Sequence, residues 1–308
     1  MVHARTPRSS RHQPLVEAGQ ATSAHERLCR ARCLLFVPGD RPDRFGTAFA
    51  SLADAVILDL EASIAPSRKA LARLAVAAAL ARPASAALLV RVNPPHTEEF
   101  ALDAAMLHEH RCDGVLLSMI ESAADVVECC RLLPDGLPII ALVETAAGIV
   151  AANEIARAQG VLRLAFGNMD YQTDTSTSGP LAMAFASSAL VIASRAAGLP
   201  APIAGVTAAF RDAAQLGRDL EFERSLGFSA KLCIHPDQIA PILEAFSVSP
   251  SMILWAERVL AAASDSHAVE LDGELIDRPV IDRARRLLAR ARREQPATPE
   301  RPHLPRPD

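Results

Sequence analysis

Residues 138–170 have the sequence PIIALVETAAGIVAANEIARAQGVLRLAFGNMD, in which two apolar runs flank an Ala-rich segment. The first run, Pro138–Val143, ends at Glu144, and the second, Leu162–Phe166, is followed four residues later by Asp170. Short apolar runs are typical of parallel strands that are buried on both faces, whereas the segment between them has the composition of a helix. The stretch therefore predicts a strand–helix–strand unit with a carboxylate just beyond each strand.

Glu144 and Asp170 are the candidate metal ligands of this unit. Functional side chains of barrels with parallel strands lie just past the carboxyl ends of the strands. Two carboxylates on adjacent strand ends suit a hard divalent cation such as Mg²⁺, which takes oxygen ligands and keeps positions open for substrate. Two solvated acids without a metal would give the same pattern. The residues at the other strand ends therefore have to distinguish a metal site from two solvated acids.

The same alternation of apolar and Ala-rich segments continues along most of the chain. Alternating strands and helices imply a parallel sheet with right-handed crossovers. Eight repeats favour an α/β fold, a closed (β/α)8 TIM barrel with a C-terminal helical extension, over an open doubly wound sheet. The residues after the first run, 37–42, lack the Gly-rich phosphate loop of the open nucleotide-binding fold. The predicted strands are Cys33–Val37, Ala55–Leu60, Ala87–Val92, Gly114–Met119, Ile139–Val143, Leu162–Phe166, Pro202–Val206 and Lys231–Ile234.

The chain divides into four parts by composition. Residues 1–28 carry Arg, His, Ser, Pro and Gln without apolar periodicity, and we expect a disordered arm. Residues 29–264 are expected to form the barrel, and residues 265–291 the C-terminal extension. Residues 292–308 are rich in Pro and charge, which predicts a disordered tail.

The overall composition excludes several classes of partner. Half of the 308 residues are hydrophobic but only 4% are aromatic, so an aliphatic core is expected. The formal net charge of −4 gives no reason to expect nucleic acid or an anionic membrane surface. No apolar run approaches the ~18 residues of a membrane span. The six cysteines lack zinc-finger spacing, which indicates free thiols in a reducing, cytoplasmic setting.

Arg91 is unusual because it lies inside the apolar run that forms the third predicted strand. A buried guanidinium is costly unless it is paired or faces a charged site. We therefore expect Arg91 to point into the mouth of the barrel, where it would clamp a carboxylate of the substrate in a bidentate way. The alternative is a purely stabilising pair with Asp59 or Glu61 on the preceding strand.

Taken together, eight stretches resemble the HpcH/HpaI aldolase and citrate lyase beta-subunit family. Each motif is modest alone, but their order along the chain is specific, and they span about residues 32 to 290. The matching stretches are Leu35–Pro42, Asp54–Glu61, Ala65–Lys69, Val90–Asn93, Ile140–Gly148, Phe166–Asp170, Lys231–Gln238 and Asp272–Pro279.

The resemblance implies a Mg²⁺-dependent carbon–carbon lyase that cleaves or condenses a 3-hydroxyacyl-CoA thioester, such as citryl-CoA or malyl-CoA, through an enolate. It implies that Glu144 and Asp170 hold the metal and that Arg91 holds the substrate's carboxylate or carbonyl end. The C-terminal extension would reach a neighbouring subunit's site, so that a homo-oligomer, a trimer or hexamer, forms the active enzyme. The resemblance assigns catalytic roles to Arg91, Glu61 and Asp277, and substrate contacts to Arg91, Pro38, Gly39, Asn93 and Glu144.

Several positions depart from the family pattern near the expected mouth. Each change removes a charge or a loop constraint, which would alter contacts to metal and substrate. A related CoA-thioester hydrolase, an aldolase acting on a free 2-oxo acid, and a non-catalytic family member therefore stay open beside the lyase. The departures are Ala62, Ser118-Met119, Ala204, Ala230 and residues 174–178.

Overall fold

The computed structural model describes residues 23–263, 269–271 and 273–294. Most of the expected arm and tail, residues 1–22 and 295–308, lie outside this part. The end of the expected arm differs from the prediction, because Ala24–Arg30 form helix α1. Leu28 of this helix is completely buried, and burial of its side chain offsets the cost of ordering the segment.

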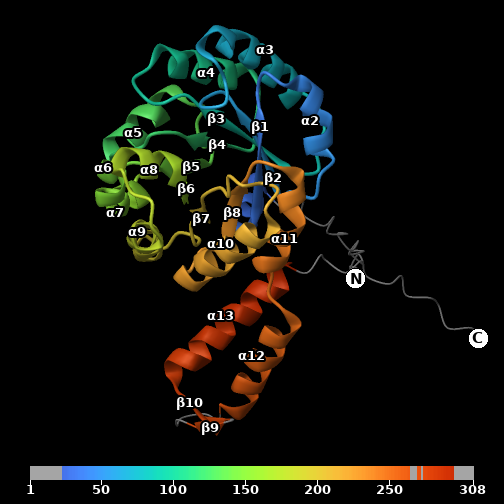
Figure 1. The fold of residues 1–308 in the computed structure, drawn as a ribbon, viewed down its shortest axis with the longest axis vertical. Coiled ribbons are helices and arrows are strands. Elements are labelled where there is room, and N and C mark those ends of the chain that lie inside the picture. Colours follow the sequence, from blue (N-terminus) through green and yellow to red (C-terminus); the bar gives the residue numbers. More distant parts are fainter. Residues whose placement is uncertain (1–22, 264–268, 272, 295–308) are drawn as a thin grey trace, which may run out of the picture.

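Eight parallel strands close into a barrel in which each strand pairs with its neighbours in chain order, and β1 pairs with β8 (Figure 1). This arrangement confirms the predicted (β/α)8 barrel and excludes the open sheet. The strand ends fall within two residues of the predicted ones. The strands are β1 (Cys33–Pro38), β2 (Ala55–Asp59), β3 (Ala87–Val92), β4 (Gly114–Leu117), β5 (Ile139–Val143), β6 (Val161–Phe166), β7 (Ile203–Ala204) and β8 (Ala230–Cys233).

Helices surround the barrel, and several begin at a Ser, Thr or Asp whose side chain accepts a hydrogen bond from the first turn. Ser122 and Asp125 form a reciprocal capping box at α5, and Thr145 caps α6 directly after Glu144. The outer helices are α2 (Pro42–Phe49), α3 (Lys69–Leu80), α4 (Glu98–Glu109), α5 (Ala123–Leu132), α6 (Ala146–Val150), α7 (Ala152–Arg157), α8 (Asn168–Thr175), α9 (Pro180–Ala196), α10 (Ala213–Leu226) and α11 (Ile239–Ala245), with short 3-10 turns η1 (Pro66–Arg68) and η2 (Pro236–Gln238).

The interior of the barrel is filled by aliphatic side chains from alternate strand positions, each contributing about 1.5–3 kcal/mol when fully buried. Helix α1 closes the amino-terminal end of the barrel. Arg163 on β6 is 1% exposed and donates to the carbonyl oxygens of Ala31 and Ala201, both at 2.7 Å, which fixes this end. The inward-facing residues include Leu34, Ile57, Leu89, Leu116, Ile140 and Leu232. All six cysteines are free thiols, as predicted.

Strand β7 is very short, and a side chain completes its pairing with β6. Only Ala165 and Ile203 pair as backbone partners in the two strands. Beyond them, Asn168 accepts from the amide of Val206 at 2.9 Å and donates to its carbonyl oxygen at 3.0 Å. A Cβ at Gly205 would lie 2.1 Å from Oδ1 of Asn168, so this bridge requires glycine at position 205.

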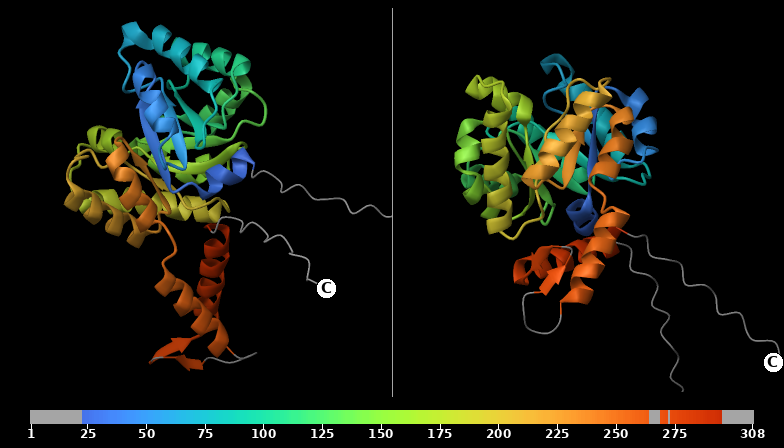
Figure 2. Two further views of the ribbon diagram at one scale, coloured as in Figure 1. Left: turned by 90° about the vertical axis from the view of Figure 1, so that its right-hand side faces the viewer. Right: turned by 60° about the horizontal axis from the view of Figure 1, so that its bottom comes forward.

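The C-terminal extension is a helical hairpin that projects away from the barrel (Figures 1 and 2). It consists of α12 (Pro250–Ala262), the two-stranded sheet β9 (Val269–Leu271) and β10 (Glu274–Ile276), and α13 (Arg278–Glu294). The hairpin has its own small core of Ala256, Val259, Ile276 and Ala284. The extension therefore begins at α12, earlier than the expected boundary at residue 264, because α12 packs on α13.

One continuous run in the described part of the chain, Pro236–Ala262, has the length and hydropathy that a membrane span requires. The run consists of η2, α11 and α12, and α11 contacts β1 and β8 in the helical layer of the barrel. Ile239 and Ile242 of the run are buried in the barrel core, and Ala256 and Val259 in the core of the hairpin.

Candidate active site

The carboxyl ends of the strands surround a pocket of about 420 Å³, here called the mouth. Asp59 at the end of β2, Arg91 on β3, Glu144 after β5 and Asp170 in the first turn of α8 all line it, together with Pro38. Parallel strands bring side chains from distant parts of the sequence to one face of the barrel in this way. Both predicted metal ligands and the predicted arginine therefore share one pocket.

Arg91 is held in the mouth by two carboxylates. Its Nε and Nη2 atoms donate to the two oxygens of Asp59 at 2.6 and 2.7 Å, a bidentate pair, and its Nη1 lies 3.3 Å from Oε2 of Glu61. The ring of Phe36 lies under the guanidinium, 4.6 Å from its carbon. Arg91 thus both faces the mouth and forms the pair that the sequence offered as the alternative.

The sequence predicted only in part that Asp59 holds Arg91 in place. Burial alone would raise the pKa of Asp59, but hydrogen bonds from Arg91, from Ser63 and from the amide of Glu61 outweigh it and hold the pKa below its ordinary value. The carboxylate therefore stays charged although it is 1% exposed. An ionised Asp59 fixes the orientation of Arg91, and the outer nitrogen of Arg91 is directed toward Glu61.

Glu144 is buried, and its Oε1 accepts a hydrogen bond from the backbone amide of Met119 at 2.7 Å. Met119 has a φ of 53°, a left-handed conformation that is uncommon for a side chain of this size. This conformation presents the amide of residue 119 to the carboxylate. No sequence pattern indicates a positive φ at Met119, so the hydrogen bond from its amide to Glu144 was not predicted.

Gly167 gives Glu144 the room that it occupies. A Cβ at position 167 would lie 2.3 Å from Cβ of Glu144 and 2.4 Å from its Oε2. The glycine also donates its amide to the carbonyl oxygen of Val143 at 3.0 Å, which continues the pairing of β5 and β6. Glycine between the end of β6 and Asp170 is therefore a packing requirement of the acidic pair.

Negative charge accumulates around Glu144. Burial, together with the nearby charges of Asp170 and Glu61, raises its pKa to about 8 against the Met119 amide and Arg91, which lower it. Burial also raises the pKa of Glu61. Asp170 is exposed at the rim. Three carboxylates, those of Asp59, Glu144 and Asp170, line the mouth with two guanidinium groups, those of Arg91 and the exposed Arg44, so the carboxylates are in surplus.

This surplus fits a divalent cation. Glu144 has one protein hydrogen-bond donor, and Arg91 is already engaged by Asp59. Within the described ranges, no group of three or more His, Cys, Asp or Glu side chains is placed to hold a metal ion. Two carboxylates with room for water and substrate oxygens are the coordination that Mg²⁺ commonly adopts, whereas structural zinc sites need a closed set of four ligands. Glu144 and Asp170 would hold the ion.

Two of the expected substrate contacts, Asn93 and Gly39, do not line the mouth, and their contact with a substrate stays a prediction. Asn93 is buried and donates to Asp103 at 2.7 Å and to the carbonyl oxygen of Leu60 at 3.1 Å, while its own oxygen accepts from Lys69. Its amide is fully used in joining β3 to the helical layer. Gly39 packs against the backbone of β2, because a Cβ there would lie 2.6 Å from the carbonyl oxygen of Asp59.

Asp277 lies between β10 and α13, where its side chain accepts from the amide of Val280 at 3.3 Å. This position is at the end of the hairpin away from the barrel (Figure 1). Asp277 is therefore far from the mouth of its own chain.

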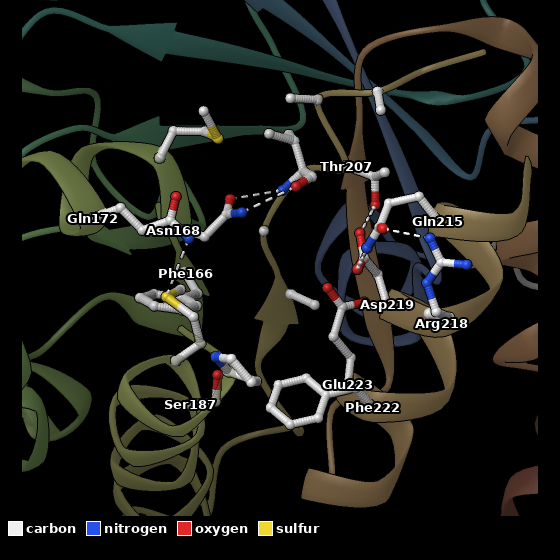
Figure 3. Close-up of a pocket in the computed structure, with 18 of the residues that line it drawn as sticks. Phe166, Asn168, Gln172, Ser187, Thr207, Gln215, Arg218, Asp219, Phe222 and Glu223 are labelled. Carbon is white, nitrogen blue, oxygen red and sulfur yellow. Dashed lines mark hydrogen bonds between the residues drawn. The ribbon is translucent and has the colours of Figure 1, made fainter. Parts of the chain in front are cut away.

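A second pocket, here called the outer pocket, lies between α9 and α10 on the outside of β7 and has a volume of about 630 Å³ (Figure 3). Lys231 on β8 points to this side of the sheet, is fully buried, and pairs with Glu223 of α10 and with the carbonyl oxygen of Gly205. Lys231 thus lies on the outer side of the barrel wall, away from the mouth. Ala204, a departure from the family pattern, lines the same pocket.

These features define a (β/α)8 barrel with an acidic, arginine-containing site at the carboxyl ends of its strands. The model of the HpcH/HpaI aldolase/citrate lyase family matches residues 32–236. The chain belongs to this family, as its motifs predicted.

Relatives with known names agree with the assignment. The chain is 34% identical over 275 residues to a citrate lyase subunit beta-like protein of Deinococcus radiodurans, covering 84% of this chain and 96% of the relative. It is 33% identical to a (3S)-malyl-CoA thioesterase of Cereibacter sphaeroides, covering 84% and 94%. The crystal structure of CitE from Mycobacterium tuberculosis in complex with magnesium, acetoacetate and coenzyme A superimposes with a TM-score of 0.74 at 34% identity, covering 85% and 98%.

Proposed function

We propose that this protein is a Mg²⁺-dependent carbon–carbon lyase that cleaves, or in reverse forms, a 3-hydroxyacyl-CoA thioester such as citryl-CoA or malyl-CoA. The observation that carries the proposal is the joint presence of Glu144, Asp170 and the Asp59-bound Arg91 in one mouth. Relatives in the family bind magnesium together with coenzyme A and acetoacetate, or with oxaloacetate, which supports both the cofactor and the substrate class.

The reaction needs a base, a positive contact for the carbonyl product and an electron sink. A base removes the proton of the 3-hydroxyl, the bond between C2 and C3 breaks, and its electron pair moves onto the thioester as an enolate. The carbon that bore the hydroxyl becomes the carbonyl of the released product, and the enolate then takes a proton at C2. When bound, Mg²⁺ supplies Lewis-acid stabilisation of the developing oxygen charge.

The chain's own residues have distinct tasks in this scheme. Arg91, fixed by Asp59, directs positive charge at the carboxylate end of the substrate, where a preorganised donor costs no reorganisation. Glu61, beside Arg91 and partly buried, is our candidate for the group that takes the hydroxyl proton. Pro38 and Phe36 form the apolar wall that excludes water from this side of the mouth.

Asp277 enters the scheme through a second copy of the chain. Because it lies at the tip of a hairpin directed away from its own barrel, we propose that it completes the mouth of a neighbouring subunit in a homo-oligomer. Asp277→Ala and Glu144→Ala would each be inactive, whereas oligomers mixed from the two variants would regain about a quarter of the sites by random assembly. A mixture that stays inactive after verified subunit exchange would reject the shared site.

A thioester hydrolase is the second candidate, because relatives at 32–33% identity bear the name (3S)-malyl-CoA thioesterase. The two activities share the metal and differ in the bond that breaks. Hydrolysis releases free CoA and leaves the carbon skeleton of the acid intact. Cleavage releases a carbonyl product and an acyl-CoA.

The deciding experiment follows both products for citryl-CoA, malyl-CoA, methylmalyl-CoA and hydroxymethylglutaryl-CoA, with and without Mg²⁺. We expect carbonyl release that requires Mg²⁺ and is lost in Glu144→Ala. Free CoA without carbonyl product would replace the lyase by the hydrolase. No turnover of any thioester, together with no Mg²⁺ binding by calorimetry, would reject both and favour a non-catalytic family member.

A further inference from the structure

A third pocket, of about 600 Å³, lies where the hairpin returns to the barrel beside α10 and α11 (Figure 1). Four arginines line it: Arg224 from the last turn of α10, and Arg283, Arg286 and Arg290 from α13. We call this pocket the arginine groove. It is formed by helices at the base of the hairpin and shares no lining residue with the mouth.

The arginine groove concentrates positive charge in a chain whose formal net charge is −4. Helix α13 contains seven arginines but only two acidic residues, Asp282 and Glu294. Glu221 is the one acidic residue lining the groove, and among the described residues no carboxylate forms an ion pair with Arg224 or Arg286. Positive charges that line one pocket repel each other, so their proximity favours an anion in the pocket.

Three of the four arginines of the groove come from α13. Arg283, Arg286 and Arg290 follow one another at intervals of three and four residues, which places them on one face of the helix. Arg283 lies over the ring of Trp255 on α12, with its guanidinium carbon 5.2 Å from the ring centroid. Arg290 donates to the carbonyl oxygen of Phe246, which anchors α13 at the floor of the groove.

The floor of the groove is apolar and already formed. Phe228 and Phe246 line it and are 4% and 2% exposed, and Met252 and Leu287 complete it. An apolar floor with a rim of guanidinium groups is complementary to a compact molecule that has an apolar or planar body and several anionic oxygens. A volume of this size is typical of small-molecule sites rather than of flat contacts between proteins.

We propose that the arginine groove binds an organic polyphosphate, a molecule with a planar body and two or more phosphate groups. Guanidinium forks match phosphate oxygens in bidentate geometry, and Arg224 and Arg286 have no ion-pair partner among the described residues. The site is distinct from the mouth, so the ligand is a regulator or a second substrate-binding element rather than the group that reacts there.

The chain offers a specific reporter for this site. It has a single tryptophan, Trp255, and Arg283 of the groove lies over its ring. Intrinsic fluorescence would be titrated with ADP, with inorganic pyrophosphate and with adenosine at near-physiological salt, and calorimetry would give the affinities independently. We expect saturable binding of ADP, weaker binding of pyrophosphate and none of adenosine, since the phosphates provide the charge-assisted contacts. Pyrophosphate binding as tight as that of ADP would assign the site to inorganic polyphosphate and overturn the role of the apolar floor.

Charge reversal separates this site from any phosphate contact at the mouth. Arg224→Glu combined with Arg286→Glu should weaken ADP binding roughly tenfold to a hundredfold, whereas Arg195→Glu, an exposed site on α9, should leave it unchanged. Equal ADP affinity in the double variant and the wild type would overturn the proposal. A wild type that binds none of the probes would also overturn it. If charge reversal then changed the oligomeric state, the arginines would form a contact between copies of the chain.

Discussion

The buried Glu144 and the half-buried Glu223 lie on opposite sides of the barrel wall, and they differ in how their charge is balanced. Glu144 faces the mouth and has a backbone amide as its donor, with Asp170 and Glu61 nearby. Glu223 faces the outer pocket (Figure 3). It pairs with the ammonium group of the fully buried Lys231. A carboxylate that is paired with a cationic side chain stabilises the fold, whereas a carboxylate without such a partner is available to bind a cation from solution.

The largest expected effect concerns the arginine of the mouth. Arg91→Lys keeps the charge but loses the bidentate contact with Asp59, and we expect kcat/KM for the thioester to fall about 10²- to 10³-fold. Glu223→Gln, on the other side of the wall, should change kcat/KM by no more than about twofold. A comparable loss of kcat/KM in the two variants would show that the outer pocket belongs to the active site, and would contradict the assigned difference between the two sides of the barrel wall.

The second prediction concerns stability against pH in the absence of metal. Burial raises the pKa of Glu144 to about 8 from an ordinary value of 4.5. A carboxyl whose folded pKa is raised contributes stability that is complete below the unfolded pKa and is lost as the pH rises through the folded pKa. The free energy of unfolding of the metal-free protein should therefore fall by an amount on the order of several kcal/mol between about pH 5 and pH 9.

Two glutamine substitutions sharpen this prediction through their opposite signs. Glu144→Gln cannot ionise, so at pH 8.5 it should be more stable than the metal-free wild type in urea unfolding. Glu223→Gln leaves Lys231 buried without a carboxylate and should cost about 2–4 kcal/mol at the same pH. Two destabilised variants, or two stabilised ones, would contradict the assigned difference in charge balance.

Gly167 provides a smaller test of the mouth's packing. Gly167→Ala would bring a methyl group to 2.3 Å from Cβ of Glu144, so the carboxylate or the backbone has to move. We expect a loss of about 1–3 kcal/mol in unfolding free energy and a weaker response to Mg²⁺. The matched control is Gly179→Ala, where no atom lies within 4 Å of the added Cβ. Identical behaviour of the two variants would show that Glu144 is not confined.

The barrel and most of the mouth were predictable because they depend on local patterns. Apolar runs that end in a carboxylate located β5 and identified Glu144, and an arginine inside such a run identified Arg91. The hydrogen bonds of Asn93 were not predicted, because its position after β3 says nothing about Asp103, ten residues later, which accepts from its amide groups. The donor at Met119 and the arginine groove depend on backbone conformation and on packing of α13 against the barrel, which sequence periodicity does not encode.

The most direct test of the central claim is a calorimetric Mg²⁺ titration of the wild type, Glu144→Gln and Asp170→Asn at pH 6 and pH 9. Because Mg²⁺ competes with the proton on Glu144, wild-type affinity should rise roughly a hundredfold between the two pH values. Both variants should lose most of the affinity at pH 9, and Glu144→Gln should also lose the pH dependence. Wild-type binding that is independent of pH, or unchanged in Glu144→Gln, would contradict the assignment of Glu144 and Asp170 as the magnesium site.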